Sequence, residues 1–400
     1  MAQETNHNPL SIHHNLPQPI LAHNTSSPYS TMVMRPRLVD SALTEPQARA
    51  ILHTIRFPGF EDEQSAPNAA LPAATLSTLT RLQIHFLLSF PFEALAMNYE
   101  PEASMAATLE HTYSRFIEQR HGGGYCLQVN LLYRELLAFL RFRFIGVLGR
   151  VYSPISETWT GLTHTASLVY LPCHLEEGKY VYYMSDVGFG SSPHRPILLR
   201  EGWEEYGRGS DKFRLVKLEI QPRSYLEQAD DETDDEVAEV ARSQVVWKLQ
   251  NRKSGKDWED CYSFATTQCF TPDYLASNCA TSSKTAVPFA SMILVVRYLL
   301  EPTRLAESAQ WIARDGLNPD LYAYHPDCIE QRMVVGDKHI VKLGDQQTVF
   351  RTIETEEERI ELLKSDFGLL HHVDTQAALR EIRAKPSALN PLPNGKNHSS

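Results

Sequence analysis

The stretch GGGYCLQVNLLYRELLAFLRFRFIGVLGRV, residues 122–151, contains the point at which the chain changes its periodicity. Three glycines break the preceding pattern, and apolar residues then recur at helical spacing from Cys126 to Phe139. After Arg143 the spacing shortens to two, which is typical of a strand. The stretch therefore predicts a loop, a helix and a strand in direct succession, with a cysteine at the start of the helix.

The chain differs in character on the two sides of this stretch. Helical patterns precede it, at 43–57, 75–90 and 103–120. Strand patterns follow it, at 144–152, 164–171, 180–186, 213–219 and 245–249. The last part is mixed, with helices at 272–278 and 356–366 and strands at 290–299, 332–342 and 347–353.

This order predicts a multidomain α+β protein. Its parts would be a helical bundle over 37–143 that carries the cysteine, a strand-rich domain over 144–265, and an α/β domain over 266–372. Residues 1–36 are interpreted as a mobile leader and 373–400 as a polar tail, because both are rich in polar residues, proline and asparagine.

Composition excludes several classes of protein. The 400 residues are 42% hydrophobic and 22% charged, which are ordinary globular values. Eight acids between 227 and 240 account for most of the net charge of −11, so we interpret this run as a solvated insertion and expect no nucleic-acid partner. No apolar run reaches the roughly 20 residues that cross a bilayer, and no secretory signal is visible. Six scattered cysteines without CxxC pairs argue against a zinc site and against a disulfide scaffold, and they favour a reducing, cytoplasmic location; no metal is expected.

Cys126 is the first candidate for chemistry. A thiol at a helix N-terminus lies against the positive end of the helix dipole, which favours the thiolate. Backbone N–H groups there, with the loop residues Gly124 and Tyr125, can stabilise an oxyanion when the thiolate attacks a carbonyl group. The alternative is that Cys126 is a small buried apolar residue.

His164 and Asp186 are the second candidate. His164 begins one expected strand and Asp186 ends the next, and if Leu171 pairs with Lys179 the two residues face each other across the hairpin. A carboxylate there would orient the imidazole and keep it charged beside a thiolate. The alternative is a purely structural cross-strand pair.

Several segments resemble the signature segments of the arylamine N-acetyltransferases. They are FPFEAL (90–95), GGYCLQVN (123–130), THTASLV (163–169), YMSDVGFG (183–190), FTPDY…N (270–278) and FRTI (350–353). The resemblance spans about residues 38–370. It implies that Cys126 is the acyl-accepting nucleophile, that His164 is its base and ion-pair partner, and that Asp186 orients the histidine.

The resemblance also implies the surroundings of this triad. Acyl-coenzyme A would contact Thr160, Gly161 and Thr163, and Phe92 and Phe189 would line the substrate pocket. The strand-rich domain would be a β-barrel and the last domain an α/β lid, around a core of the cysteine-protease and transglutaminase type.

The implied activity is transfer of an acetyl or another short acyl group to an arylamine or arylhydrazine by a ping-pong mechanism. Acyl-coenzyme A would be a co-substrate, with no bound cofactor. Two alternatives stay open: a cysteine hydrolase or transglutaminase-like enzyme with the same triad, and a non-catalytic homologue. The sequence leaves the acyl donor, the amine and the oligomeric state open.

The chain departs from the family pattern at three places. Gly122 stands where the family usually has arginine, with Arg120 as the nearest arginine, and Ala94 stands where it has asparagine. The serine-rich turn before Phe289 is altered to SSKTAVPF (282–289), so family contacts with coenzyme A are not transferred to this turn.

Overall fold

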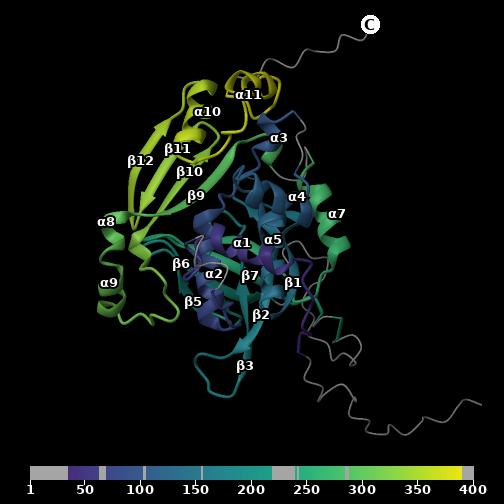
Figure 1. Ribbon diagram of the computed structural model, residues 1–400, viewed down its shortest axis with the longest axis vertical. Coiled ribbons are helices and arrows are strands. Elements are labelled where there is room, and N and C mark those ends of the chain that lie inside the picture. The colour runs from purple at the N-terminus through teal and green to yellow at the C-terminus, as the bar shows by residue number, and fades with distance from the viewer. Residues whose placement is uncertain are drawn as a thin grey trace, which may run out of the picture. The chain divides into compact units, whose positions relative to one another are not determined.

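The computed structural model describes residues 35–62, 69–101, 105–154, 156–218, 239–240, 243–283 and 288–389. The predicted leader, except for its last two residues, and nearly all of the acidic run lie outside these described residues. The elements are labelled in Figure 1.

Helices dominate the chain up to Phe139. The principal ones are α1 (Glu45–Thr54), α2 (Leu76–Ser89) and α5 (Cys126–Phe139). Thr44 caps α1 in a capping box with Gln47, and Thr75 caps α2 through the N–H of Thr78. The single helix predicted over 103–120 is shorter and divided into α4 (Leu109–Tyr113) and a π-helical turn (Ser114–Glu118). A further short helix, α3 (Ala96–Tyr99), precedes this segment.

Eight antiparallel strands follow in one sheet. In sequence order they are β1 (Arg143–Ser153), β2 (Thr158–Pro172), β3 (Tyr180–Ser185), β4 (Ile197–Leu198), β5 (Glu204–Tyr206), β6 (Lys212–Leu218), β7 (Val246–Arg252) and β8 (Trp258–Phe264). Their order in the sheet is β4-β3-β2-β1-β8-β7-β6-β5, so the predicted barrel is a near-closed sheet whose edge strands are β4 and β5. Helix α5 packs against β2, which brings the start of the helix close to the centre of this sheet.

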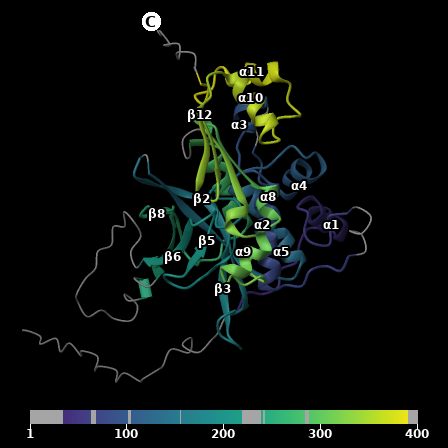
Figure 2. The ribbon, with the colours of Figure 1, turned by 90° about the vertical axis from the view of Figure 1, so that its left-hand side faces the viewer.

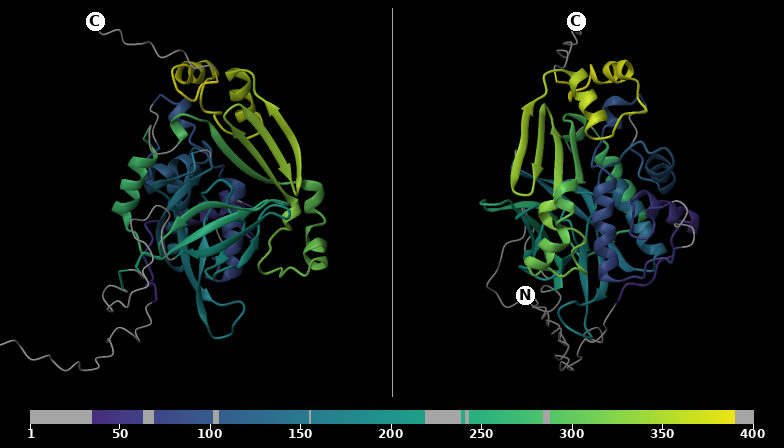
Figure 3. Two further views of the ribbon diagram at one scale, coloured as in Figure 1. Left: turned by 180° about the vertical axis from the view of Figure 1, so that it is seen from behind. Right: turned by 60° about the vertical axis from the view of Figure 1, so that its left-hand side comes forward.

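A second sheet has four antiparallel strands in the order β12-β11-β10-β9 (Figure 3). They are β9 (Leu294–Leu300), β10 (Ile329–Val335), β11 (Lys338–Leu343) and β12 (Gln346–Thr352). The single strand expected over 332–342 is wrong, because Gly336 adopts a positive φ of 61° and turns the chain between β10 and β11.

Short helices complete the part after residue 265. They are α7 (Thr271–Thr281), α8 (Pro302–Leu305), α9 (Ser308–Arg314), α10 (Glu356–Ser365) and α11 (Thr375–Ile382), with 3₁₀ turns at Pro288–Ala290 and Pro326–Cys328.

Helix α11 corrects the expectation of a polar tail from residue 373. Asp374 caps it through the N–H of Ala377, and Ala378 and Ile382 are fully buried in one cluster with residues of α10. Figure 2 shows α11 beside α10 and α3. The segment is strongly amphipathic, and this periodicity was a usable signal that the polar composition of the tail concealed.

One strand-like contact connects the C-terminal sheet to the loop that carries Cys126. Phe92 forms an antiparallel bridge with Val296 of β9 and a parallel bridge with Gly124. Because backbone hydrogen bonds fix both neighbours, the segment around Phe92 positions the cysteine loop against β9. The domain boundaries expected near residues 143 and 265 stay predictions.

Candidate active site

Cys126 is the first residue of α5, and backbone contacts hold the loop before it. Tyr125 occupies the N-cap position without a side-chain cap hydrogen bond. The N–H of Gly124 donates to the carbonyl oxygen of Pro91 at 3.2 Å, and the N–H of Glu93 donates to the carbonyl oxygen of Gly124 at 3.2 Å. The sulfur of Cys126 therefore stands at the positive end of a 14-residue helix whose first N–H groups are not capped by a side chain.

The predicted role of Gly124 as an oxyanion donor is wrong, because its N–H already donates to Pro91. A Cβ atom at Gly124 would overlap Oε1 of Gln128, so close packing requires glycine here. Within the described part of the chain, no backbone acceptor is recorded for the N–H groups of Tyr125 and Cys126. These two groups are the remaining candidates for stabilising an oxyanion.

The structure brings His164 and Asp186 together, although not in the expected strand register. Nε2 of His164 donates to Oδ2 of Asp186 at 2.8 Å, and both side chains are buried. In the ladder of β2 with β3, Leu171 pairs with Val181 and not with Lys179, so the register differs by two residues from the expectation. Asp186 lies just past the end of β3, and the contact is made by side chains beyond the ladder.

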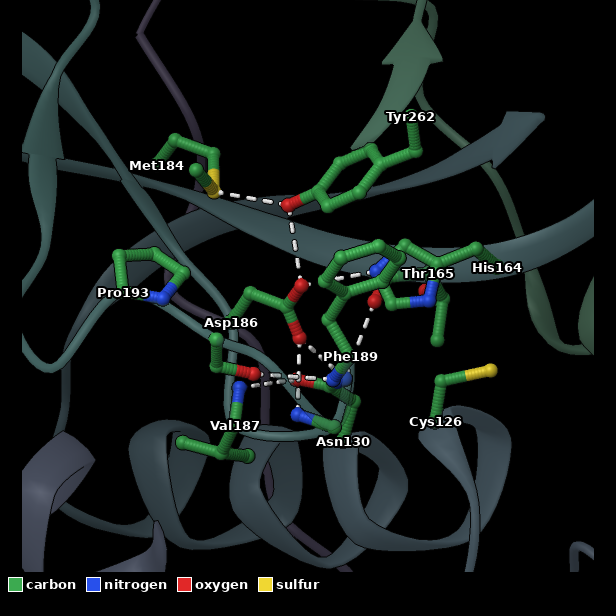
Figure 4. Close-up of polar contacts among 12 residues, drawn as sticks. Cys126, Asn130, His164, Thr165, Met184, Asp186, Val187, Phe189, Pro193 and Tyr262 are labelled. Carbon is green, nitrogen blue, oxygen red and sulfur yellow. Dashed lines mark hydrogen bonds and ion pairs between the residues drawn. The ribbon is translucent and has the colours of Figure 1, made fainter. Parts of the chain in front are cut away.

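Four hydrogen bonds converge on the carboxylate of Asp186 (Figure 4). Oδ1 accepts from Nδ2 of Asn130 at 3.0 Å and from the N–H of Gly188 at 2.9 Å. Oδ2 accepts from Nε2 of His164 and, at 2.9 Å, from Oη of Tyr262. Burial alone would raise the pKa of this carboxyl group, but its partners, with His164 foremost, hold the pKa below its ordinary value. Asp186 therefore keeps its charge although it is fully buried.

The charge of Asp186 in turn controls the protonation of His164. Burial by itself would lower the pKa of the imidazole. The negative charge of Asp186, followed by the interaction with Cys126, outweighs burial and raises the pKa of His164 to about 10. A protonated imidazole beside a cysteine is the arrangement that supports a nucleophilic thiolate.

The three residues expected to contact acyl-coenzyme A lie on β2, close to His164. Oγ1 of Thr160 and Oγ1 of Thr163 are 2.8 Å apart, and Sγ of Cys126 lies 3.3 Å from the carbonyl oxygen of Thr163, which it can reach as a donor only in its thiol form. Thr163 is buried, whereas Gly161 is exposed and a Cβ there would meet no atom within 4 Å. Open space at Gly161 next to the buried cysteine is compatible with a long ligand that enters along β2.

Aromatic residues surround the triad. The ring of Phe189 lies 5.3 Å from the His164 ring and 5.0 Å from the Tyr262 ring. Phe92 is half-buried, with its ring 5.8 Å from that of Phe289, which stacks on Tyr125 at 5.6 Å. Of the two residues expected to line the substrate pocket, Phe189 therefore lies beside His164, and Phe92 lies near the loop that carries Cys126.

Two residues of the site were not found from the sequence. Asn130 lies four residues after Cys126, on the same face of α5, and its position was a usable signal. Tyr262 comes from β8, and its ring centroid lies 4.4 Å from that of His164. Nothing local in the sequence indicates that it reaches Asp186.

The structure explains why glycine occupies position 122, where the family resemblance leads one to expect arginine. Its φ is +116°, and a Cβ there would overlap Cδ2 of Leu369. A side chain at this position would be strained and would clash with Leu369.

A different arginine approaches the buried Glu93. Nη2 of Arg115 lies 3.8 Å from Oε1 of Glu93 and 2.9 Å from Oε1 of Glu100. Burial raises the pKa of Glu93 to about 7, although Arg115 opposes this shift. Arg120 does not take this place, because it is exposed and forms no ion pair with any of the described residues.

In the part of the chain that the structure describes, no group of three or more His, Cys, Asp or Glu side chains is arranged to hold a metal ion. None of its helices combines the length and the apolar character that crossing a bilayer requires.

Comparison with protein families and curated proteins identifies relatives of this chain. A model of the N-acetyltransferase family matches residues 75–308, which is more than half of the 400 residues. The chain is 23% identical over 315 residues to an N-malonyltransferase of Gibberella moniliformis, covering 74% of this chain and 77% of the relative. It is 32% identical over 133 residues to arylamine N-acetyltransferase 2 of Macaca mulatta, covering 32% of this chain and 42% of the relative.

Solved structures share the fold. The arylamine N-acetyltransferase of Mycobacterium abscessus superimposes with a TM-score of 0.61 at 21% identity, covering 85% of this chain and 95% of that one. The enzyme of Mycobacterium marinum in complex with CoA gives a TM-score of 0.57 at 19% identity, covering 83% of this chain and 97% of that one.

Proposed function

Because the chain belongs to the arylamine N-acetyltransferase family, we propose that it transfers a short acyl group from acyl-coenzyme A to the nitrogen of an arylamine or arylhydrazine. The family makes it an acyltransferase, and the proposal concerns its substrates, its mechanism and its residues. The observation that carries the mechanism is the buried His164, held between Asp186 and Cys126 with its pKa raised to about 10.

The first half-reaction forms an acyl-enzyme. The Cys126 thiolate attacks the thioester carbonyl carbon, and the N–H groups of Tyr125 and Cys126 stabilise the oxyanion. The carbon–sulfur bond to coenzyme A then breaks, and the leaving thiolate takes a proton from the His164 imidazolium. Attacking and leaving groups are both thiols, so little free energy is lost in the exchange.

The second half-reaction transfers the acyl group to the amine. The amine nitrogen attacks the carbonyl carbon of acyl-Cys126, and the now neutral His164 accepts the proton that the nitrogen loses. The bond from carbon to Sγ breaks, which regenerates the thiolate and imidazolium. Asp186 stabilises the charged ring in the resting enzyme, and Asn130 and Tyr262 hold Asp186 in place.

We assign substrate contacts to the residues around the triad. Thr160, Gly161 and Thr163 would contact acyl-coenzyme A along β2, where Gly161 is open to solvent. Phe92 and Phe189 would enclose the acyl group and the aromatic ring of the amine, since their rings stand on two sides of the triad.

Intact-protein mass spectrometry tests this proposal. The protein is mixed with acetyl-coenzyme A or with malonyl-coenzyme A, because relatives of both kinds match the chain. We expect a mass gain of one acyl group, absent in Cys126→Ser, and the larger gain under equal conditions identifies the preferred donor.

Adding aniline then separates the alternatives. Prompt loss of the adduct with formation of the anilide supports transfer. Equally fast loss in buffer without aniline indicates a cysteine hydrolase, and the absence of any adduct with either donor indicates a non-catalytic homologue.

A further inference from the structure

A cavity of about 380 Å³ is lined by residues from the C-terminal ends of α1 and α2 and from strand β9. Arg56, Arg120 and Arg297 line it, and its wall includes Pro91 and Gly122 from the segments that hold the cysteine loop. The triad residues are not among its lining residues. It is therefore a solvent-open pocket distinct from the triad, and it borders the segments that hold the cysteine loop.

The three arginines have no carboxylate partner within the described residues, where none of them forms an ion pair. Arg297 donates only a long hydrogen bond of 3.5 Å to the carbonyl oxygen of Asp366. Glu61 is the one acidic residue in the lining, and it accepts from the N–H of Gly59. Three arginines against one glutamate give the lining residues an excess of positive charge.

Arg56 and Arg120 both adopt a positive φ, of 52° and 56°, which glycine adopts without strain. The charge of Arg297 is placed at a cost. Arg297 faces Arg332 directly across β9 and β10, and burial together with Arg332 lowers the pKa of Arg297. Like charges opposite each other destabilise a sheet, and a bound anion would relieve this repulsion.

The rest of the lining is aromatic. Phe90, Phe116 and Phe367 contribute to it and are buried. Because these rings are at most 4% exposed, they support the cavity wall and offer little surface to a ligand. Guanidinium groups form paired hydrogen bonds with phosphate oxygens. We propose that this cavity binds the phosphate group of an organic phosphate between Arg56, Arg120 and Arg297.

Binding of phenyl phosphate, measured by calorimetry in the absence of acyl donor and amine, tests the site independently of the transferase activity. The double variant Arg56→Gly, Arg120→Gly removes two charges and also relieves two strained backbone positions, so it should stay folded. The matched control is Arg141→Gly, because Arg141 has a φ of 63° and lies outside the cavity.

We expect phenyl phosphate to bind more tightly than phenol, and the double variant to bind it about tenfold more weakly or worse. Arg141→Gly should bind as the unmodified protein does. No binding of phenyl phosphate to the unmodified protein, or equal binding to the double variant, would overturn the proposal.

Competition identifies the source of the phosphate. If coenzyme A displaces phenyl phosphate and dephospho-coenzyme A does not, the site receives the 3′-phosphate of the acyl donor. If neither displaces it, the ligand is a separate organic phosphate. Both results presuppose the anion site, and neither depends on whether Cys126 forms an acyl adduct.

Discussion

Replacing Asp186 by Asn removes one negative charge from the site with almost no change of shape. The carboxylate accepts from His164, Tyr262, Asn130 and Gly188. An amide group can accept at one of its two positions only, and its NH₂ group can turn the imidazole to the wrong tautomer.

The structure allows the size of the effect to be worked out. The pKa of His164 is about 10 against an ordinary value of 6.5, a difference worth about 5 kcal/mol in favour of the charged ring. Asp186 is the leading favourable cause, and burial opposes it. Without the charge of Asp186, burial dominates and the ring should be neutral at pH 7. We expect turnover to fall by about 10³ to 10⁴.

Two assays report on the pairing itself. The rate at which iodoacetamide alkylates Cys126 should be high at neutral pH in the unmodified protein and should rise only at higher pH in Asp186→Asn. Because the folded-state pKa of His164 is raised, its stabilising contribution is complete below about pH 6.5 and is lost as pH rises through about 10. The free energy of unfolding should therefore fall over this range, and less steeply in the variant.

Asp315→Asn is the matched control. Oδ2 of Asp315 accepts a hydrogen bond of 2.9 Å from Nε2 of His325, and neither residue belongs to the active site. This variant should keep normal turnover and a normal alkylation profile. If folded Asp186→Asn shows turnover within a few-fold of the unmodified protein and an unchanged alkylation profile, Asp186 does not control the pair and the reasoning is refuted.

Three other substitutions have defined outcomes. Tyr262→Phe keeps the ring against His164 but removes a hydrogen bond to the buried carboxylate of Asp186. The value of kcat/KM, measured across pH, should fall about tenfold or more. A change of less than twofold would contradict this expectation. Arg115→Ala removes the cation beside the buried Glu93 and leaves Glu100 with His372 as its other partner. It should lower the free energy of unfolding in urea by about 3–5 kcal/mol, whereas a loss below about 1 kcal/mol would show that the ion pairs are dispensable. Gly122→Arg introduces the residue that the family usually has at this position. It should destabilise the protein by more than about 1 kcal/mol, because φ is +116° and Leu369 occupies the space that a side chain would need. Unchanged thermal stability of the variant would disprove this expectation.

Local sequence patterns determined where the principal helices and most of the strands lie along the chain. The change from helix to strand at residues 139–143 was readable because helical and strand periodicities differ within a few residues. The start of α5 at Cys126 was readable because glycines precede it and an apolar stripe follows. Family resemblance added the roles of Cys126, His164 and Asp186, which remain proposals for this chain.

Patterns failed where the signal was short or ambiguous. The strand expected over 332–342 is two strands, because alternation continues on both sides of a turn that only the positive φ of Gly336 reveals. Helix α11 was missed because the tail was interpreted by its polar composition, although the segment is amphipathic and Asp374 supplies an N-cap. The hairpin register was misjudged by two residues because nothing in the loop fixes its length.

Tertiary structure alone decided how the site is completed. Tyr262 reaches Asp186 across 76 positions of sequence, and Arg115 approaches Glu93 from a π-helical turn. The convergence of Arg56, Arg120 and Arg297 on one cavity likewise depends on elements far apart in the chain. Periodicity reports which face of an element is apolar, but not which distant element packs against it. The charge state of His164 is set by that packing, because burial and Asp186 act on it in opposite directions and their balance exists only in the folded protein.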